Sequence, residues 1–157
     1  MLKDILTAIF RLTPNRVRDW FSRATNASFM ASAGAVVLDD QGRVLLLEHV
    51  FRTGCGWGIP GGFLNADEQP DEGLRRELRE EVGLEVQDVE IAFVRTFSKP
   101  KQIQITFRCR AAGEAHARGI EVRSAAWFAL DALPAELSEN QRALIERALG
   151  NGANGQR

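Results

Sequence analysis

Residues 61–84 read GGFLNADEQPDEGLRRELREEVGL, and their pattern predicts one amphipathic helix that begins near Pro70. Proline suits the first turn of a helix, where its missing N–H costs nothing, and the two acids after it suit the positive end of the helix dipole. An apolar stripe then recurs at four-residue spacing, at Leu74, Leu78 and Val82. Because Gly83 follows this stripe directly, and glycine commonly ends helices, we expect the helix to stop there.

Three glutamates fall on one arc of this helix, beside the apolar stripe: Glu77, Glu80 and Glu81. At roughly 100° per residue, positions three and four apart project together, so the carboxylates repel one another unless a cation lies among them. One interpretation is a solvated helix whose glutamates are neutralised by neighbouring arginines: Arg75, Arg76 and Arg79. The other is a divalent metal site, because ligands that are all oxygen suit hard ions such as Mg²⁺ or Mn²⁺.

The surrounding residues decide between these interpretations. Nine positions resemble the Nudix box, G-x5-E-x7-R-E-U-x-E-E-x-G-U with U aliphatic: Gly62, Glu68, Arg76, Glu77, Leu78, Glu80, Glu81, Gly83 and Leu84. Every defined position matches, and a Gly-Gly pair leads into the box after Trp57 and Pro60. Agreement at so many fixed positions rarely arises by chance, so the resemblance favours the metal site.

The resemblance implies both a fold and a reaction. The implied fold is an α/β domain, with the Nudix-type α/β/α sandwich around a mixed β-sheet. The implied reaction is metal-dependent hydrolysis of a nucleoside diphosphate linked to another moiety, in which water attacks one phosphorus. A divalent ion, Mg²⁺ or Mn²⁺, would neutralise the diphosphate oxygens in such a reaction.

Carried over position by position, the resemblance implies three metal ligands: Glu77, Glu80 and Glu81. It implies a further ligand at the backbone carbonyl of Gly61 or Gly62, since a residue without Cβ lets the backbone approach closely. It also implies that Arg76 and Glu68 form an ion pair that fixes the loop against the helix. A purely stabilising role for that pair stays open.

The general base is not assigned by the box. In the family it is a box glutamate or an acid on a later loop, and this chain offers Glu114 and Glu121 there. Glu121, ahead of Ala-Ala-Trp-Phe, is similar to a glutamate found before that aromatic strand in relatives. It is therefore our candidate for metal or base chemistry, against the alternative of a solvated loop residue. His49 and His116 are interpreted as structural or surface residues, because no partner acid accompanies either.

The substrate is less defined than the reaction. Pro100 lies sixteen residues past Leu84, a spacing that resembles the marker of ADP-ribose pyrophosphatases. Ser-Lys-Pro-Lys is also an ordinary hairpin turn, and the chain is short for the dimeric ADP-ribose enzymes. Triphosphates, dinucleoside polyphosphates, nucleotide alcohols and capped RNA ends stay open as substrates. A nucleotide-sensing Nudix domain without turnover is the alternative of another class, although such domains usually carry broken boxes.

Composition limits the remaining possibilities. The chain has 157 residues, enough for one domain, and a formal net charge of −1, which offers no electrostatic footprint for a nucleic-acid polymer. Cys55 and Cys109 lack metal-ligand spacing and come with no secretory signal, so a cytoplasmic location is expected. No run approaches the roughly 20 apolar residues that cross a bilayer, so no membrane partner is expected.

Strand patterns lie on both sides of the box, at residues 29–38, 43–49, 89–97, 102–109 and 125–130. Turns are predicted at residues 39–42 and 98–101, and a capping box of Ser138 and Gln141 opens a last helix that reaches about Leu149. The order of strands, helix, strands and helix predicts a mixed-sheet domain.

We expect three segments: a helical arm at residues 1–28, the Nudix domain at 29–149 and a disordered tail at 150–157. Apolar stripes in the arm, at Ile5, Ile9, Trp20 and Phe21 among others, predict that it packs against something. Three roles stay open for the arm: packing on the domain or on a second copy in a homodimer, covering a partner or substrate, or lying on a membrane surface.

Overall fold

The computed structural model describes residues 13–17, 27–50, 56–118 and 120–150. Most of the predicted arm, residues 151–157 of the predicted tail and Cys55 lie outside the described residues. The helices and strands are, in chain order, β1 Met30–Leu38, β2 Val44–His49, β3 Trp57–Gly58, β4 Gly61–Phe63, α3 Pro70–Val82, β5 Val86–Ser98, β6 Lys101–Ala111, β7 Val122–Phe128 and α4 Glu139–Ala148. No helix in this part of the chain is long and apolar enough to cross a membrane.

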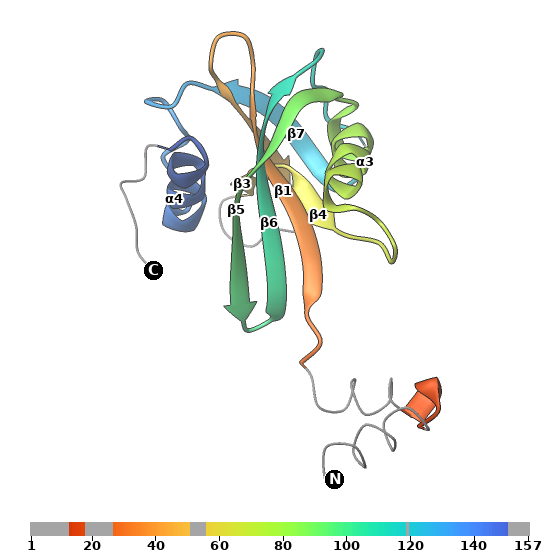
Figure 1. The fold of residues 1–157 in the computed structure, drawn as a ribbon. Coiled ribbons are helices and arrows are strands. Elements are labelled where there is room, and N and C mark those ends of the chain that lie inside the picture. Colours follow the sequence, from red (N-terminus) through yellow and green to blue (C-terminus); the bar gives the residue numbers. More distant parts are fainter. Residues whose placement is uncertain (1–12, 18–26, 51–55, 119, 151–157) are drawn as a thin grey trace.

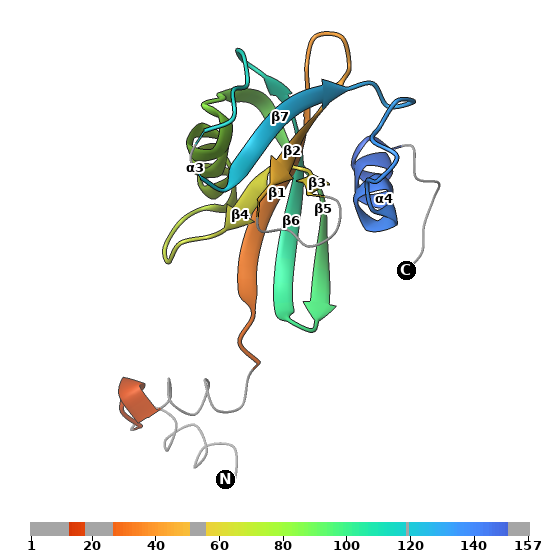
Figure 2. The same ribbon diagram turned by 180° about the vertical axis from the view of Figure 1, so that it is seen from behind.

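One mixed sheet of seven strands forms the centre of the domain (Figure 1). The strand order is β3-β2-β1-β6-β5, with β4 paired to β1 and β7 paired to β2. β1 and β6 run parallel, with Met30 opposite Gln102 and Leu38 opposite Arg110, and the other pairs are antiparallel. α3 and α4 lie on opposite sides of the sheet, as the two views show (Figures 1 and 2). This arrangement confirms the predicted α/β/α sandwich.

Each face of the sheet has its own apolar core. The core under α3 contains Leu74, Leu78 and Val82 of the helix together with alternate residues of β1 and β2. The core under α4 contains the opposite set, with Val36, Val44 and Leu46 against Leu144 and Ile145. Successive side chains of a strand point to opposite faces, so a strand covered on both sides must be apolar throughout. The residues of β2 from 44 to 47 are fully buried for this reason, as the sequence predicts.

Strand ends differ from the prediction where pairing partners are distant in sequence. β7 begins at Val122 rather than residue 125, because Val122 pairs with His49 and Ser124 with Glu48. β5 begins at Val86 rather than residue 89, because Val86 pairs with Ala111. β3 and β4 were not predicted at all. Their glycine-rich sequence has no alternation, and they are strands only because β2 and β1 offer them backbone partners.

The residues predicted to end α3 and to begin α4 do so, but the predicted capping box of α4 is only half formed. Gly83 ends α3 in the left-handed region at φ 66°, and its N–H bonds to Arg79. At α4, the Ser138 hydroxyl accepts a hydrogen bond from the Gln141 backbone N–H at 3.3 Å, which is half of the predicted capping box. The Gln141 side chain instead accepts from the Ile59 backbone N–H at 3.1 Å. α4 is thereby tied to the segment that precedes β4.

Replacing Leu78 with alanine tests the packing of α3. Leu78 is fully buried against the sheet, so Leu78→Ala should lower the free energy of unfolding by about 2–5 kcal/mol in chemical denaturation. Arg79→Ala is the control in the next position, because its half-exposed side chain contacts Glu85 at the surface. That change should cost less than about 1 kcal/mol. Equal losses for the two variants would contradict the packing described here.

Candidate active site

A pocket lies where β4, α3 and the end of β2 meet. It is lined by His49, Gly61, Gly62, Phe63, Asn65, Arg76, Glu77, Glu81 and Glu121. Glu121 reaches it from the start of β7, where its backbone oxygen accepts from the Val50 N–H at 2.9 Å. The structure therefore brings together six of the site residues predicted from the sequence: Gly61, Gly62, Arg76, Glu77, Glu81 and Glu121. Of the other predicted residues, Glu68 contacts Arg76 beside the pocket, and the last is Glu80. That carboxylate does not line the pocket, and its side chain is 62% exposed.

The two glycines of β4 let the backbone run between β1 and the acids of α3. Gly61 has φ 139°, and a Cβ there would lie 2.2 Å from the Ala33 carbonyl oxygen. A Cβ on Gly62 would lie 2.3 Å from Glu77 Oε1. The Gly61 N–H donates to Glu81 Oε2 at 3.2 Å. Only residues without a side chain fit this passage, so the close backbone approach expected from the sequence is present.

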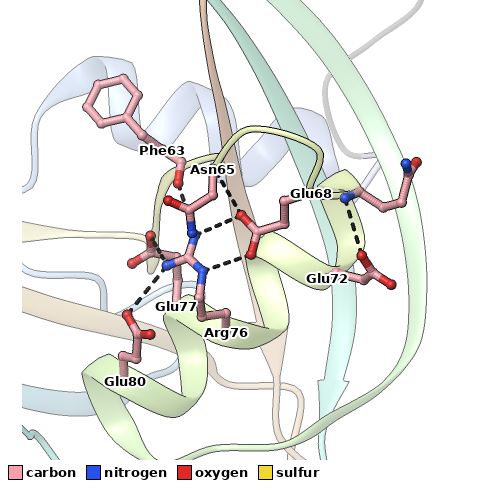
Figure 3. Close-up of polar contacts among 8 residues, drawn as sticks. Phe63, Asn65, Glu68, Glu72, Arg76, Glu77 and Glu80 are labelled. Carbon is pink, nitrogen blue, oxygen red and sulfur yellow. Dashed lines mark hydrogen bonds and ion pairs between the residues drawn. The ribbon is translucent and has the colours of Figure 1, made fainter.

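Arg76 forms the predicted pair with Glu68 in bidentate geometry (Figure 3). Its Nε and Nη2 donate to the two Glu68 oxygens at 2.8 and 3.0 Å, and Nη2 also donates to the Phe63 carbonyl at 3.1 Å. On the other side, Nη1 donates to Glu77 at 2.8 Å and to Glu80 at 3.4 Å. One guanidinium thus joins the loop after β4 to two of the predicted metal ligands.

These contacts shift the titration of the pair. The Arg76 guanidinium, followed by the Asn65 backbone N–H, lowers the pKa of Glu68 from 4.5 to about 2. Glu68 and Glu77 in turn raise the pKa of Arg76. Both groups are therefore charged at neutral pH, and the ion pair holds the loop to the helix.

Arg76 also supplies the positive charge that three close carboxylates require. Its Nη1 lies between Glu77 and Glu80, while Glu81 Oε2 accepts from Gly61 and Glu81 Oε1 lies 3.8 Å from His49 Nδ1. Among the described residues, no three acidic, histidine or cysteine side chains already surround a common point as metal ligands would. Of the three neighbouring arginines, Arg76 contacts these glutamates, whereas Arg75 Nη1 donates to the Val86 carbonyl and Arg79 pairs with Glu85.

Sequence reasoning missed some contacts of the site and its surroundings. The premise that neither histidine has a partner acid is wrong. His49 lies near Glu81, and His116 Nε2 lies 3.2 Å from Glu114 Oε2 on an exposed loop. His49 is far before Glu81 in the chain, and only the fold brings them together. Phe63 and Asn65 also line the pocket, and their positions inside the box could have signalled it.

Two further residues have local explanations. Trp57 packs edge-on against Phe128, with ring centroids 5.2 Å apart, and belongs to the core under α4. Pro100 lies in the two-residue turn between β5 and β6, which agrees with the hairpin interpretation of Ser-Lys-Pro-Lys.

Comparison with known proteins identifies the family of the chain. Residues 28–148 match the family model described as the NUDIX domain. A MutT-like protein of Streptomyces ambofaciens is 30% identical over 109 residues, which cover 69% of each chain. An RNA pyrophosphohydrolase of Stutzerimonas stutzeri is 44% identical over 63 residues, which are 40% of this chain and only 38% of that protein.

Among solved structures, the NUDIX domain of Shewanella oneidensis NrtR complexed with ADP ribose aligns with a TM-score of 0.70. The alignment covers 89% of this chain and 99% of that one, at 19% identity, and so shows the fold. The family match spans all the strands, both helices and the pocket of the described chain. The chain therefore belongs to the Nudix hydrolase superfamily, pyrophosphohydrolases that act on acid anhydrides in phosphorus-containing compounds.

Proposed function

We propose that this chain hydrolyses the diphosphate linkage of a nucleoside diphosphate derivative, either ADP-ribose or another small nucleotide, with a divalent metal. The observation that supports this most is the pocket in which Glu77 and Glu81 of α3 meet the glycine backbone of β4 and the carboxylate of Glu121. Acids that lie together with backbone oxygens and a guanidinium fit a site for phosphoryl transfer better than they fit a solvated surface of the protein.

The donors of the pocket fit a hard divalent cation. We assign its protein ligands to Glu77, Glu80 and Glu81 and to the backbone carbonyl of Gly61 or Gly62, since Mg²⁺ and Mn²⁺ prefer oxygen donors. When bound, such an ion supplies positive charge against the diphosphate oxygens and acidifies water. The protein's own contribution is to fix those donors. Glu81 is held by the Gly61 N–H, and Glu77 by Arg76.

We assign the remaining roles by position. Glu121 is exposed at the rim of the pocket, where its carboxylate can accept a proton from the attacking water. Arg76 acts as a positioning residue, because it ties the β4 backbone at Phe63 and the Glu68 loop to Glu77. Its five hydrogen bonds leave this guanidinium little freedom to follow a substrate.

A second candidate is a nucleoside triphosphate pyrophosphohydrolase. The similarity to a MutT-like protein and to an RNA pyrophosphohydrolase favours it, although the latter match covers a minor part of that relative. The fold shared with a domain solved with ADP ribose favours the first candidate only weakly, since its identity is 19%. Pro100 adds nothing to the choice, because its place in a tight turn explains it.

A substrate panel tests the proposed activity. Purified protein with Mg²⁺ or Mn²⁺ should convert at least one of ADP-ribose, ATP, GTP and CDP-choline to its nucleoside monophosphate, measured by chromatography of the products. Turnover of a triphosphate with ADP-ribose untouched would select the second candidate. Tight binding of nucleotide with no turnover of any substrate would contradict a hydrolase and indicate a nucleotide-sensing domain.

Charge removal on α3 tests the ligand assignment. Glu80→Gln and Glu81→Gln keep side-chain size, and the amide introduced by the second change still offers an oxygen to the Gly61 N–H, so the fold should survive. Each change removes one negative charge from the metal site and should lower kcat/KM by about 10²-fold or more. Arg79→Gln is the matched control, because Arg79 pairs with Glu85 at 2.9 Å away from the pocket. Parent-like kcat/KM in both glutamate variants, with unchanged melting curves, would place the site elsewhere.

The Arg76–Glu68 pair predicts a pH dependence of stability. Because the folded pKa of Glu68 lies near 2 and its ordinary value is 4.5, its stabilising effect is complete above pH 4.5 and is lost as the pH falls toward 2. The difference in unfolding free energy between parent and Glu68→Gln should therefore be largest above pH 4.5 and shrink below it. Denaturant titrations between about pH 2 and pH 7 measure this difference. Glu85→Gln, which breaks the exposed pair with Arg79, is the control, and its difference in unfolding free energy should vary much less with pH. If the difference for Glu68→Gln does not depend on pH, the Arg76–Glu68 pair does not have the proposed role.

A further inference from the structure

The loop that follows β6, residues 112–118, covers the C-terminal end of α3. The backbone N–H of Arg118 donates to the carbonyl oxygen of Glu81 at 2.7 Å, and that of His116 donates to the carbonyl oxygen of Val82 at 2.9 Å. A helix leaves the carbonyl groups of its last turn without partners inside the helix. The last two carbonyls of α3 therefore find their donors in a loop that is distant in sequence.

The side chain of Arg118 lies against the same helix end. A Cβ on Gly83 would lie 2.2 Å from Arg118 Cζ and 2.4 Å from its Nη2. Gly83 therefore meets two requirements, a left-handed backbone at φ 66° and space for a guanidinium. The C-terminal end of a helix carries partial negative charge, so a cation at this place stabilises both the helix end and the loop on it.

The same loop leads to Glu121, which we assign as the base. Downstream, Glu121 is fixed by the sheet, because its carbonyl oxygen accepts from the Val50 N–H at 2.9 Å. Upstream, the contacts of Arg118 fix the chain to the end of α3 shortly before Glu121. Glu81, from the last turn of α3, lines the same pocket as Glu121. The chain around Glu121 is therefore held by β2 on one side and by the helix that carries Glu81 on the other.

We propose that Arg118 is a positioning residue that sets the Glu121 carboxylate relative to Glu81 across the pocket. It acts through its backbone N–H on Glu81 and its guanidinium on Gly83, from outside the pocket lining. The proposal rests on the proposed function, in which Glu121 accepts a proton from the attacking water. Without the guanidinium, the loop separates from α3 more often, and Glu121 is in place for a smaller fraction of the time.

A double-mutant cycle tests this role with Mg²⁺ and the substrate that the panel selects. Arg118→Ala should lower kcat about tenfold and change KM less than about twofold, because the residue acts on the base and not on substrate binding. Arg118→Lys keeps a cation at the helix end and should recover most of the loss. In the Glu121→Gln background, Arg118→Ala should lower kcat no further. Arg123→Ala is the matched control and should keep the parent kcat, since Arg123 follows Glu121 and pairs with Glu48.

Amide hydrogen exchange without metal tests the placement of the loop itself. The His116 N–H ties the loop to α3, and the Val50 N–H ties Glu121 to the end of β2. In Arg118→Ala both amides should exchange about tenfold faster than in the parent, because the loop opens more often. The amide of Phe107, buried in β6, should exchange at the parent rate.

The outcomes separate this inference from the proposed function. A parent-like kcat in Arg118→Ala would overturn the positioning role. A tenfold loss that persists in the Glu121→Gln background would overturn it too, because Arg118 would then act independently of the base. Unchanged exchange at His116 and Val50 would show that the guanidinium does not hold the loop. Faster exchange in a protein that hydrolyses nothing would support the placement and contradict only the proposed function.

Discussion

The bidentate pair between Arg76 and Glu68 is the interaction on which the site depends (Figure 3). The loop after β4 contains few apolar residues and has no regular structure of its own, so it needs a charged contact to hold it. Arg76 provides that contact and also orders Glu77 and Glu80 through its remaining N–H groups. The same guanidinium therefore determines where the loop lies and where two acids point. This double role explains why an arginine, and not the point charge of a lysine, suits the position.

A second constraint is the space between β1 and α3. The β4 backbone enters that space, and each of its two glycines is adjacent to an atom that a side chain would strike, the Ala33 oxygen or the Glu77 carboxylate. The helix can stay close because Leu74 and Leu78 are fully buried on the same face of the sheet. The apolar packing of α3 thus sets the distance between the β4 backbone and the acids of α3. Glycine fits at that distance because it has no side chain.

The sequence predicts best what depends on neighbours along the chain. α3 follows from its apolar spacing and its end signals, and β2 from a continuous apolar run. The parts that it does not predict depend on partners far along the chain. β3 and β4 are strands because they pair with β2 and β1. His49 lies near Glu81 only because the fold brings them together. Arg95 likewise contacts Asn140, which is 45 positions later in the chain. Glu121 enters the pocket for the same reason, and only its resemblance to a family position pointed to it.

The two faces of the sheet present different charged side chains. The α3 face presents the acids, which need a cation before any phosphate can approach them, since bare carboxylates repel phosphate oxygens. The α4 face presents Arg95 and Arg147, whose guanidinium groups contact neutral amides and aromatic rings. The acids belong to the box that the superfamily shares, and we assign to them the reaction that its members share. Discrimination among nucleotides must therefore come from residues outside the box. On the α4 face, the guanidinium groups of Arg95 and Arg147 form no ion pair with an acid within the described ranges.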